Sequence, residues 1–136
     1  MKVCIIVSNF YPEISKMLLK GASKKLVNKN LTSLKIVKVP GCFEIPVVIS
    51  NLANKYDGFV ALGCVIKGQT PHFDFLCTSI FNALTILNIE KKIPIGNGIL
   101  TCNNKKQAIK RSDPRKIDKG GSAAQALLSL LQIIKK

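Results

Sequence analysis

The chain is poor in several residue types, and each shortage restricts what it can do. Its 136 residues include no tryptophan, one histidine, two arginines and seven acidic residues. The five cysteines contain no CxxC pair, and a lone histidine gives no Cys/His spacing of the kind that binds zinc. Their odd number also argues against a disulfide framework. These shortages favour a protein with reduced thiols, no metal centre and no disulfide scaffold.

Long hydrophobic runs are also missing from the sequence. The apolar start "MKVCIIVSNF" is too short for the core of a signal peptide, and no small-residue cleavage site follows it. No segment is expected to reach the length of about 20 apolar residues that crosses a bilayer. We therefore expect a cytoplasmic protein. With 47% hydrophobic residues the chain can bury a core, and residues 1–136 are predicted to form one domain.

The net charge of +14 raises the possibility of a nucleic-acid-binding protein, because Lys and Arg neutralise phosphates. Nearly all the basic residues are lysines, however, and they are spread from Lys2 to Lys136. Recognition of bases and phosphates favours the planar fork of arginine. A solvated lysine-rich surface is the simplest interpretation. A positive field that attracts small anionic substrates is a second one, and nucleic-acid binding is the least favoured.

Hydrophobic periodicity predicts strands that alternate with helices. Strands are expected at 3–8, 34–39, 58–66 and 93–101, and helices at 13–29, 44–55, 71–89, 105–111 and 120–136. The last helix is expected to start at a Gly-Ser cap and to end in two lysines. This alternation predicts a flavodoxin-like three-layer αβα sandwich, in which helices flank a four-stranded parallel sheet.

Ligands bind at the carboxyl ends of the strands in such sheets. That rule brings together "SNFY", "PGCFE", "GCVIKGQTPH" and "GNGILT". In the third segment Gly68 allows a tight turn, Thr70 is a good N-cap and Pro71 suits the first helical position. The amides of Gln69 and Thr70 would then form an anion site at a helix N-terminus.

Two polar residues beside these turns are candidates for chemistry. His72 can donate and accept a proton near neutral pH, although a lone histidine is more often a cap or a surface residue. Glu44 could accept hydrogen bonds from a substrate, or it could simply be a first-turn acid that is favoured by the helix dipole.

The segments "VPGCFEIP" (39–46), "ALGCVIKGQTPHFDF" (61–75), "IPIGNGILT" (93–101) and "QAIKR" followed by "DKGG" (107–121) resemble the signature segments of the 6,7-dimethyl-8-ribityllumazine synthase family, in order and spacing. The resemblance implies a transferase of riboflavin biosynthesis. That enzyme condenses 5-amino-6-(D-ribitylamino)uracil with 3,4-dihydroxy-2-butanone 4-phosphate and releases phosphate and water. It also implies no cofactor, no metal and sites between the subunits of a homopentamer.

The resemblance further implies a role for individual residues. His72 would be the acid/base group, Phe10 would stack on the pyrimidine ring, and Glu44 would hold the ribityl chain. The residues implied for the ribitylaminouracil are Phe10, Cys42, Phe43, Glu44, Cys64, Val65, Ile66, Asn97 and Lys119, with Asn97 on the neighbouring subunit's side. The residues implied for the butanone phosphate are Gln69, Thr70 and Arg111.

Some positions depart from the family pattern, namely Tyr11, Lys67, Asn97 and Asp118. None removes a group that the reaction needs, but the pyrimidine pocket is expected to differ on the Asn97 side. Because the first strand begins almost at Met1, a free pentamer is expected rather than an icosahedral shell. A catalytically weak relative that binds flavins or lumazines would use the same pocket and is the main alternative.

Overall fold

The computed structural model of the chain describes residues 1–27 and 29–134. Its strands are β1 (Lys2–Ser8), β2 (Ser33–Val39), β3 (Gly58–Ile66) and β4 (Ile95–Cys102). Its α-helices are α1 (Pro12–Leu26), α2 (Ile45–Leu52), α3 (His72–Ile89), α4 (Lys105–Ser112) and α5 (Lys119–Ile134), and a short 3₁₀ helix, η1 (Cys42–Glu44), precedes α2.

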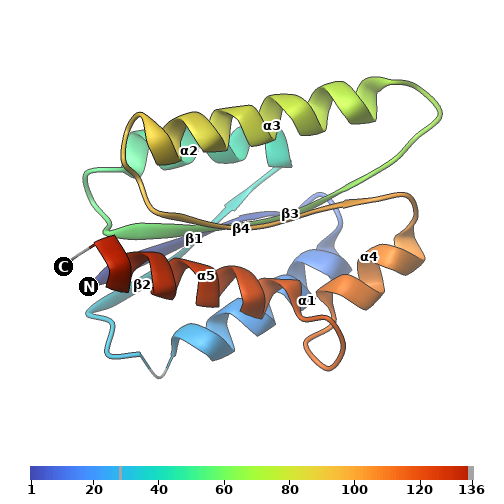
Figure 1. Cartoon of the computed structure of the whole chain (residues 1–136). Coiled ribbons are helices and arrows are strands. Elements are labelled where there is room, and N and C mark those ends of the chain that lie inside the picture. Colours follow the sequence, from blue (N-terminus) through green and yellow to red (C-terminus); the bar gives the residue numbers. More distant parts are fainter. Residues whose placement is uncertain (28, 135–136) are drawn as a thin grey trace.

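The four strands form one parallel sheet in the order β2-β1-β3-β4. Helices α2 and α3 cover one face, and α1, α4 and α5 cover the other (Figure 1). Each face carries its own cluster of buried apolar side chains. The predicted three-layer αβα sandwich is therefore confirmed.

The central strand β3 has the burial pattern that this fold requires. Eight of its nine residues are buried, as expected for a strand that is covered by helices on both faces. At its end Ile66 pairs with Cys102 of β4. The amide of Lys67 then donates to the Cys102 carbonyl at 2.9 Å. The segments that leave β3 and β4 therefore start side by side at the carboxyl edge of the sheet.

Two predicted helix caps were wrong. Helix α3 begins at His72 with Pro71 at the N-cap position, although the Thr70 hydroxyl still accepts a hydrogen bond from the His72 amide at 3.4 Å. Helix α5 begins at Lys119, so the Gly-Ser pair lies inside it. The Asp118 carboxylate accepts from the Gly121 amide at 3.2 Å and takes the capping role instead. The predicted C-terminal lysines, Lys135 and Lys136, lie outside the described residues.

The segment predicted as a helix over 44–55 is also shorter than expected. Residues 42–44 form the 3₁₀ helix η1, and α2 ends at Leu52. Pro46 lies in the first turn of α2, where its missing amide hydrogen costs no hydrogen bond. The result is a tight bend directly after β2, which brings Cys42, Phe43 and Glu44 to the carboxyl edge of the sheet.

Helix α3 is more apolar than the sequence analysis expected. Its 18 residues have a mean hydropathy of 1.2, so by length and composition it could cross a membrane, and 22% of it is buried in the single chain. One such helix is weak evidence for a membrane span, because core helices pass the same test. What the structure adds is that much of the apolar surface of α3 is uncovered, including Phe75 and Ile86.

Candidate active site

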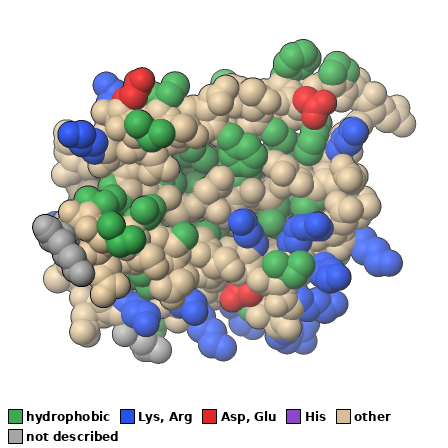
Figure 2. All heavy atoms as spheres, in the orientation of Figure 1, with side chains coloured by type: hydrophobic (Ala, Val, Ile, Leu, Met, Phe, Trp, Pro, Cys, Tyr) green, Lys and Arg blue, Asp and Glu red, His purple; other side chains and the backbone are tan. Residues whose placement is uncertain are grey.

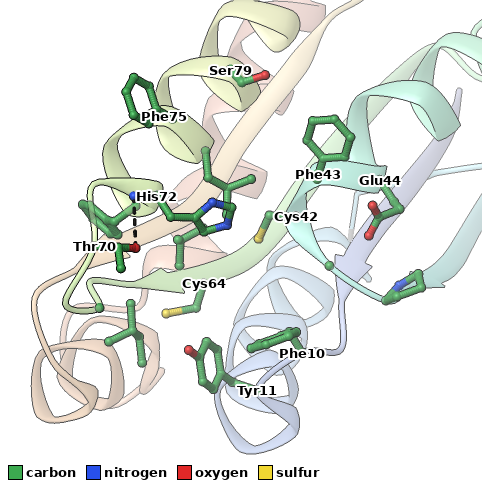
Figure 3. Close-up of a pocket in the computed structure, with 17 residues that line it drawn as sticks. Phe10, Tyr11, Cys42, Phe43, Glu44, Cys64, Thr70, His72, Phe75 and Ser79 are labelled. Atoms are coloured by element: carbon green, nitrogen blue, oxygen red, sulfur yellow. Dashed lines mark hydrogen bonds between the residues drawn. The ribbon is translucent and has the colours of Figure 1, made fainter.

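An open pocket of about 760 Å³ lies at the carboxyl edge of the sheet. Its walls come from the segment after β1, the η1 turn, the end of β3 and the first two turns of α3. Figure 3 shows these parts facing one another across the pocket. The rule that ligands bind at this edge in parallel α/β sheets therefore holds for the location of the cavity.

The structure brings nine of the thirteen predicted site residues together. The predicted residues that line the pocket are Phe10, Cys42, Phe43, Glu44, Cys64, Val65, Ile66, Thr70 and His72. They come from four separate parts of the sequence, and the parallel strands place them at one edge.

Four predicted residues do not line this pocket. Gln69 lies in the turn between the lining residues Gly68 and Thr70. Asn97 is an exposed residue of β4, at the edge of the sheet, and its side-chain oxygen accepts from the Ile99 amide at 3.0 Å. Arg111 and Lys119 are half-buried, on α4 and at the start of α5. A single chain therefore does not gather the whole predicted site.

Sequence reasoning missed part of the wall that α3 provides. Phe73, Phe75, Leu76 and Ser79 line the pocket, but the sequence analysis chose only His72 from this helix. The available signal was helical spacing, because residues 72, 75, 76 and 79 lie on one side of a helix. Once His72 is placed at the site, that spacing selects Phe75, Leu76 and Ser79, although not Phe73.

His72 occupies the first turn of α3. Its backbone amide is anchored to the Thr70 hydroxyl, and its imidazole points into the pocket on the side of Cys42 (Figure 3). The side chain is exposed, so a proton can move between the ring and a bound molecule. An exposed imidazole in a pocket wall can come within hydrogen-bond reach of a bound molecule, as general acid/base catalysis requires.

The turn before His72 has free backbone donors. Among the described residues, the amides of Gln69 and Thr70 have no hydrogen-bond acceptor in the protein. They precede the N-terminus of an 18-residue helix, where the positive end of the helix dipole favours an anion. This turn is therefore suited to hold a phosphate group.

Three phenylalanines surround the pocket with their rings open to solvent. Phe10, Phe43 and Phe75 are 66%, 61% and 72% exposed. Phe10 is held against Tyr11, with ring centroids 5.0 Å apart in an edge arrangement. Exposed aromatic rings around one cavity offer stacking surfaces for a flat heterocycle.

The two cysteines of the pocket are kept protonated. Burial raises the pKa of Cys42 to about 11. Burial, reinforced by the neighbouring Cys102 and Cys42, raises the pKa of Cys64 to about 12. A thiolate is the nucleophilic form of cysteine. At neutral pH these side chains therefore act as small apolar wall residues and not as nucleophiles.

In the described part of the chain no three His, Cys, Asp or Glu side chains are grouped so that they could hold a metal ion. Fold and pocket together define a class: a parallel α/β protein with an open pocket at the carboxyl edge of its sheet, where a histidine adjoins a turn with free backbone amides.

The comparisons with known proteins give the family. The family model for 6,7-dimethyl-8-ribityllumazine synthase matches residues 1–135. A protein of that name from Bartonella tribocorum is 44% identical over 137 residues, which cover 98% of this chain and 90% of the relative. Relatives of the same name from Mycobacterium leprae and Cutibacterium acnes are 41% and 38% identical and cover 95% and 96% of this chain, over 82% and 80% of their own lengths. The chain belongs to the 6,7-dimethyl-8-ribityllumazine synthase family.

Proposed function

We propose that this chain is the transferase that condenses 5-amino-6-(D-ribitylamino)uracil with 3,4-dihydroxy-2-butanone 4-phosphate. The products are 6,7-dimethyl-8-ribityllumazine, phosphate and water, in the penultimate step of riboflavin biosynthesis. The observation that carries the proposal is the pocket itself. His72 lines this pocket together with exposed aromatic rings, next to the free amides of Gln69 and Thr70, and this supports an acid/base role for its imidazole.

Each part of the reaction has a matching group. The amine of the uracil attacks the ketone and one water leaves to give an imine, and enolisation of the imine then expels phosphate. After tautomerisation to a ketone and rotation of the side chain, the ribitylamino nitrogen attacks the new carbonyl, and loss of a second water closes the ring. His72 would transfer the protons in these steps. Because the reaction joins two substrates, holding them in one pocket would supply much of the remaining acceleration.

The substrates would be divided between the two sides of the pocket. Phe10 would stack on the pyrimidine ring, Glu44 would accept hydrogen bonds from ribityl hydroxyls, and the end of β3 would read the uracil edge through its backbone. The amides of Gln69 and Thr70 would hold the phosphate, and Arg111 would supply the countercharge.

The role of His72 is tested by replacing it with Ala and with Gln. We expect the turnover number to fall by about two to four powers of ten, with residual activity, because a positioned acid/base group is typically worth that much. The assay mixes purified protein with both substrates and follows the fluorescence of the lumazine. Asn82→Ala, on the exposed part of α3 away from the pocket, is the control. An unchanged turnover number in both His72 variants would remove His72 from the mechanism.

The same assay separates the enzyme from a non-catalytic relative that binds flavins or lumazines. Such a protein would retain the pocket and would bind the lumazine product, but would form none from the two substrates. Fluorescence that rises with time and scales with protein concentration supports the enzyme.

We also propose that the active form is a homopentamer with its sites between subunits. The support is the incomplete site of the single chain, since Asn97, Arg111 and Lys119 lie outside the pocket lining while the pocket phenylalanines and α3 leave apolar surface uncovered. Light scattering should give about 75 kDa, five chains of 14.9 kDa each. A monomer, or a particle of megadalton size, contradicts the pentamer.

Five free thiols suit a reducing compartment, which supports a cytoplasmic location.

A further inference from the structure

Positive charge is unevenly divided between the two helical layers. Helix α2 carries no charged residue and α3 carries one acid, Asp74. By contrast, α1, α4 and residues 113–119 carry eleven basic residues and three acids. Figure 2 shows Lys and Arg side chains gathered at the end of the molecule where α4 lies.

Part of this charge lies beside the turn that is proposed to bind phosphate. Lys67 directly precedes the pocket residue Gly68, and its amide is bonded to the Cys102 carbonyl at 2.9 Å. Helix α4 starts three residues after Cys102, and its first two residues are Lys105 and Lys106. The turn and the basic helix therefore leave the sheet from adjacent strand ends.

The remaining charges of α4 extend this region. Lys110 and Arg111 lie in its last turn, and the positive charge of Arg111 opposes the burial that raises the pKa of Cys102, which places Arg111 close to the end of β4. Helix α4 contains no acid. All four charged residues of α4 are therefore basic.

Little of this charge is neutralised locally. Lys105 pairs with Glu13 at 3.6 Å, and both side chains are 63% exposed. Within residues 1–27 and 29–134, Lys67, Lys106 and Lys110 form no ion pair, and all three are exposed. Their charges are available to an anion that approaches the pocket.

We propose that Lys67, Lys106 and Lys110 form a cationic rim that strengthens binding of the phosphorylated substrate without contacting it. This inference rests on the proposed function. Charges in solution act over roughly 8–10 Å at ordinary ionic strength, and a cleft edged by charge of one sign raises the local concentration of the opposite ion. The phosphate monoester is the strongly anionic substrate of the pair, so the rim favours it over the uncharged ribitylaminouracil.

The test replaces all three rim lysines with glutamine, as Lys67→Gln/Lys106→Gln/Lys110→Gln. The matched control is Lys24→Gln/Lys55→Gln/Lys91→Gln, which removes three exposed charges near the amino ends of the strands. At low ionic strength we expect the rim variant to raise the KM for the butanone phosphate about 5–10-fold, because each exposed charge contributes a factor of roughly two. The control should change this KM less than two-fold. The turnover number and the KM for ribitylaminouracil should stay unchanged in both.

The dependence of KM on salt concentration provides a second measurement. It would be the same in wild type and rim variant if the three lysines had only a structural role. The wild-type KM for the butanone phosphate should rise as salt is added, and the difference between wild type and rim variant should disappear near 0.5 M salt, where screening is effective over only a few Å. Equal KM values for the rim and control variants, or a difference that persists at high salt, would overturn the proposal.

A probe that needs no turnover keeps this test independent of the proposed function. Inorganic phosphate is titrated into wild type and both variants, and its binding is followed by phosphorus NMR. Weaker binding by the rim variant alone supports the rim even if no lumazine is formed. Equal binding by all three proteins refutes it even if the wild-type protein is an active enzyme.

Discussion

The contact between β3 and the pocket residue Cys42 provides a sharp test of the packing. Gly63 lies in β3 beneath the η1 turn, and a Cβ atom at this position would be 2.5 Å from the Cys42 sulfur and 3.0 Å from the Ser8 Cβ. Ordinary contact begins at 3.4 Å. In Gly63→Ala the sulfur would therefore have to move by about 0.9 Å, against the other buried side chains around it.

The size of the effect follows from two opposing contributions. Overpacking of a dense core costs about 1–3 kcal/mol, while replacing glycine by alanine within a strand returns about 0.5–1 kcal/mol of backbone entropy. The strain is the larger contribution. We expect Gly63→Ala to lower the free energy of unfolding by about 1–2 kcal/mol, which is a fall in Tm of roughly 3–10 °C for a chain of this length.

The assay is thermal unfolding followed by circular dichroism at fixed protein concentration. Gly68→Ala is the control, because a Cβ there meets nothing within 4 Å. Cys42→Ala removes the clashing sulfur, so Gly63→Ala combined with Cys42→Ala should be more stable than the sum of the two single effects by at least about 1 kcal/mol. Additive effects in the double variant, or a Gly63→Ala protein as stable as wild type, would refute this description of the packing between Gly63 and Cys42.

Two further predictions concern the crossing of α1 and α5 and the pocket thiols. In Gly120→Ala the new methyl group would overlap the backbone carbonyl of Leu18, which a rotamer change cannot relieve, so the loss of Tm should exceed that of Gly63→Ala. The Cys64 pKa rises from 9.0 to about 12 on folding. The part of the free energy of unfolding that depends on the protonated Cys64 thiol is therefore complete below pH 9 and is lost as the pH rises toward 12. At pH 8 iodoacetamide should label Cys64 only after unfolding in urea, and rapid labelling of the folded protein would contradict the assignment.

Much of the fold could be predicted from β3. Its residues form an almost continuous apolar run. Where strands alternate with helices, such a run indicates a central strand that is covered on both faces. Once the sheet is parallel, the carboxyl ends of the strands form one edge, and nine predicted site residues meet there. The location of the site thus follows from topology, which local patterns specify well.

The start of α5 could not be predicted in the same way. A Gly-Ser pair is a good local cap, but Gly120 is needed where α5 crosses α1, and Asp118 supplies the cap from a left-handed backbone conformation with φ of 53°. The competing requirement came from a helix about 100 residues earlier in the chain. Local sequence contains no signal for such a contact.

The surroundings of Asn97 were unpredictable for a related reason. The residue is exposed on the last strand of the sheet, so the described part of the single chain leaves it uncovered. Periodicity describes how one chain folds on itself and carries no information about a second copy.

The proposed cationic rim has a consequence after the reaction as well. The attraction that would draw in a phosphorylated ketone would act equally on the inorganic phosphate that is left behind, since both carry their charge on the same group. Free phosphate would therefore compete with the substrate for the pocket. A cell rich in free phosphate would keep a fraction of these pockets occupied by the spent leaving group, so that the rate of lumazine formation would respond to the phosphate status of the cell.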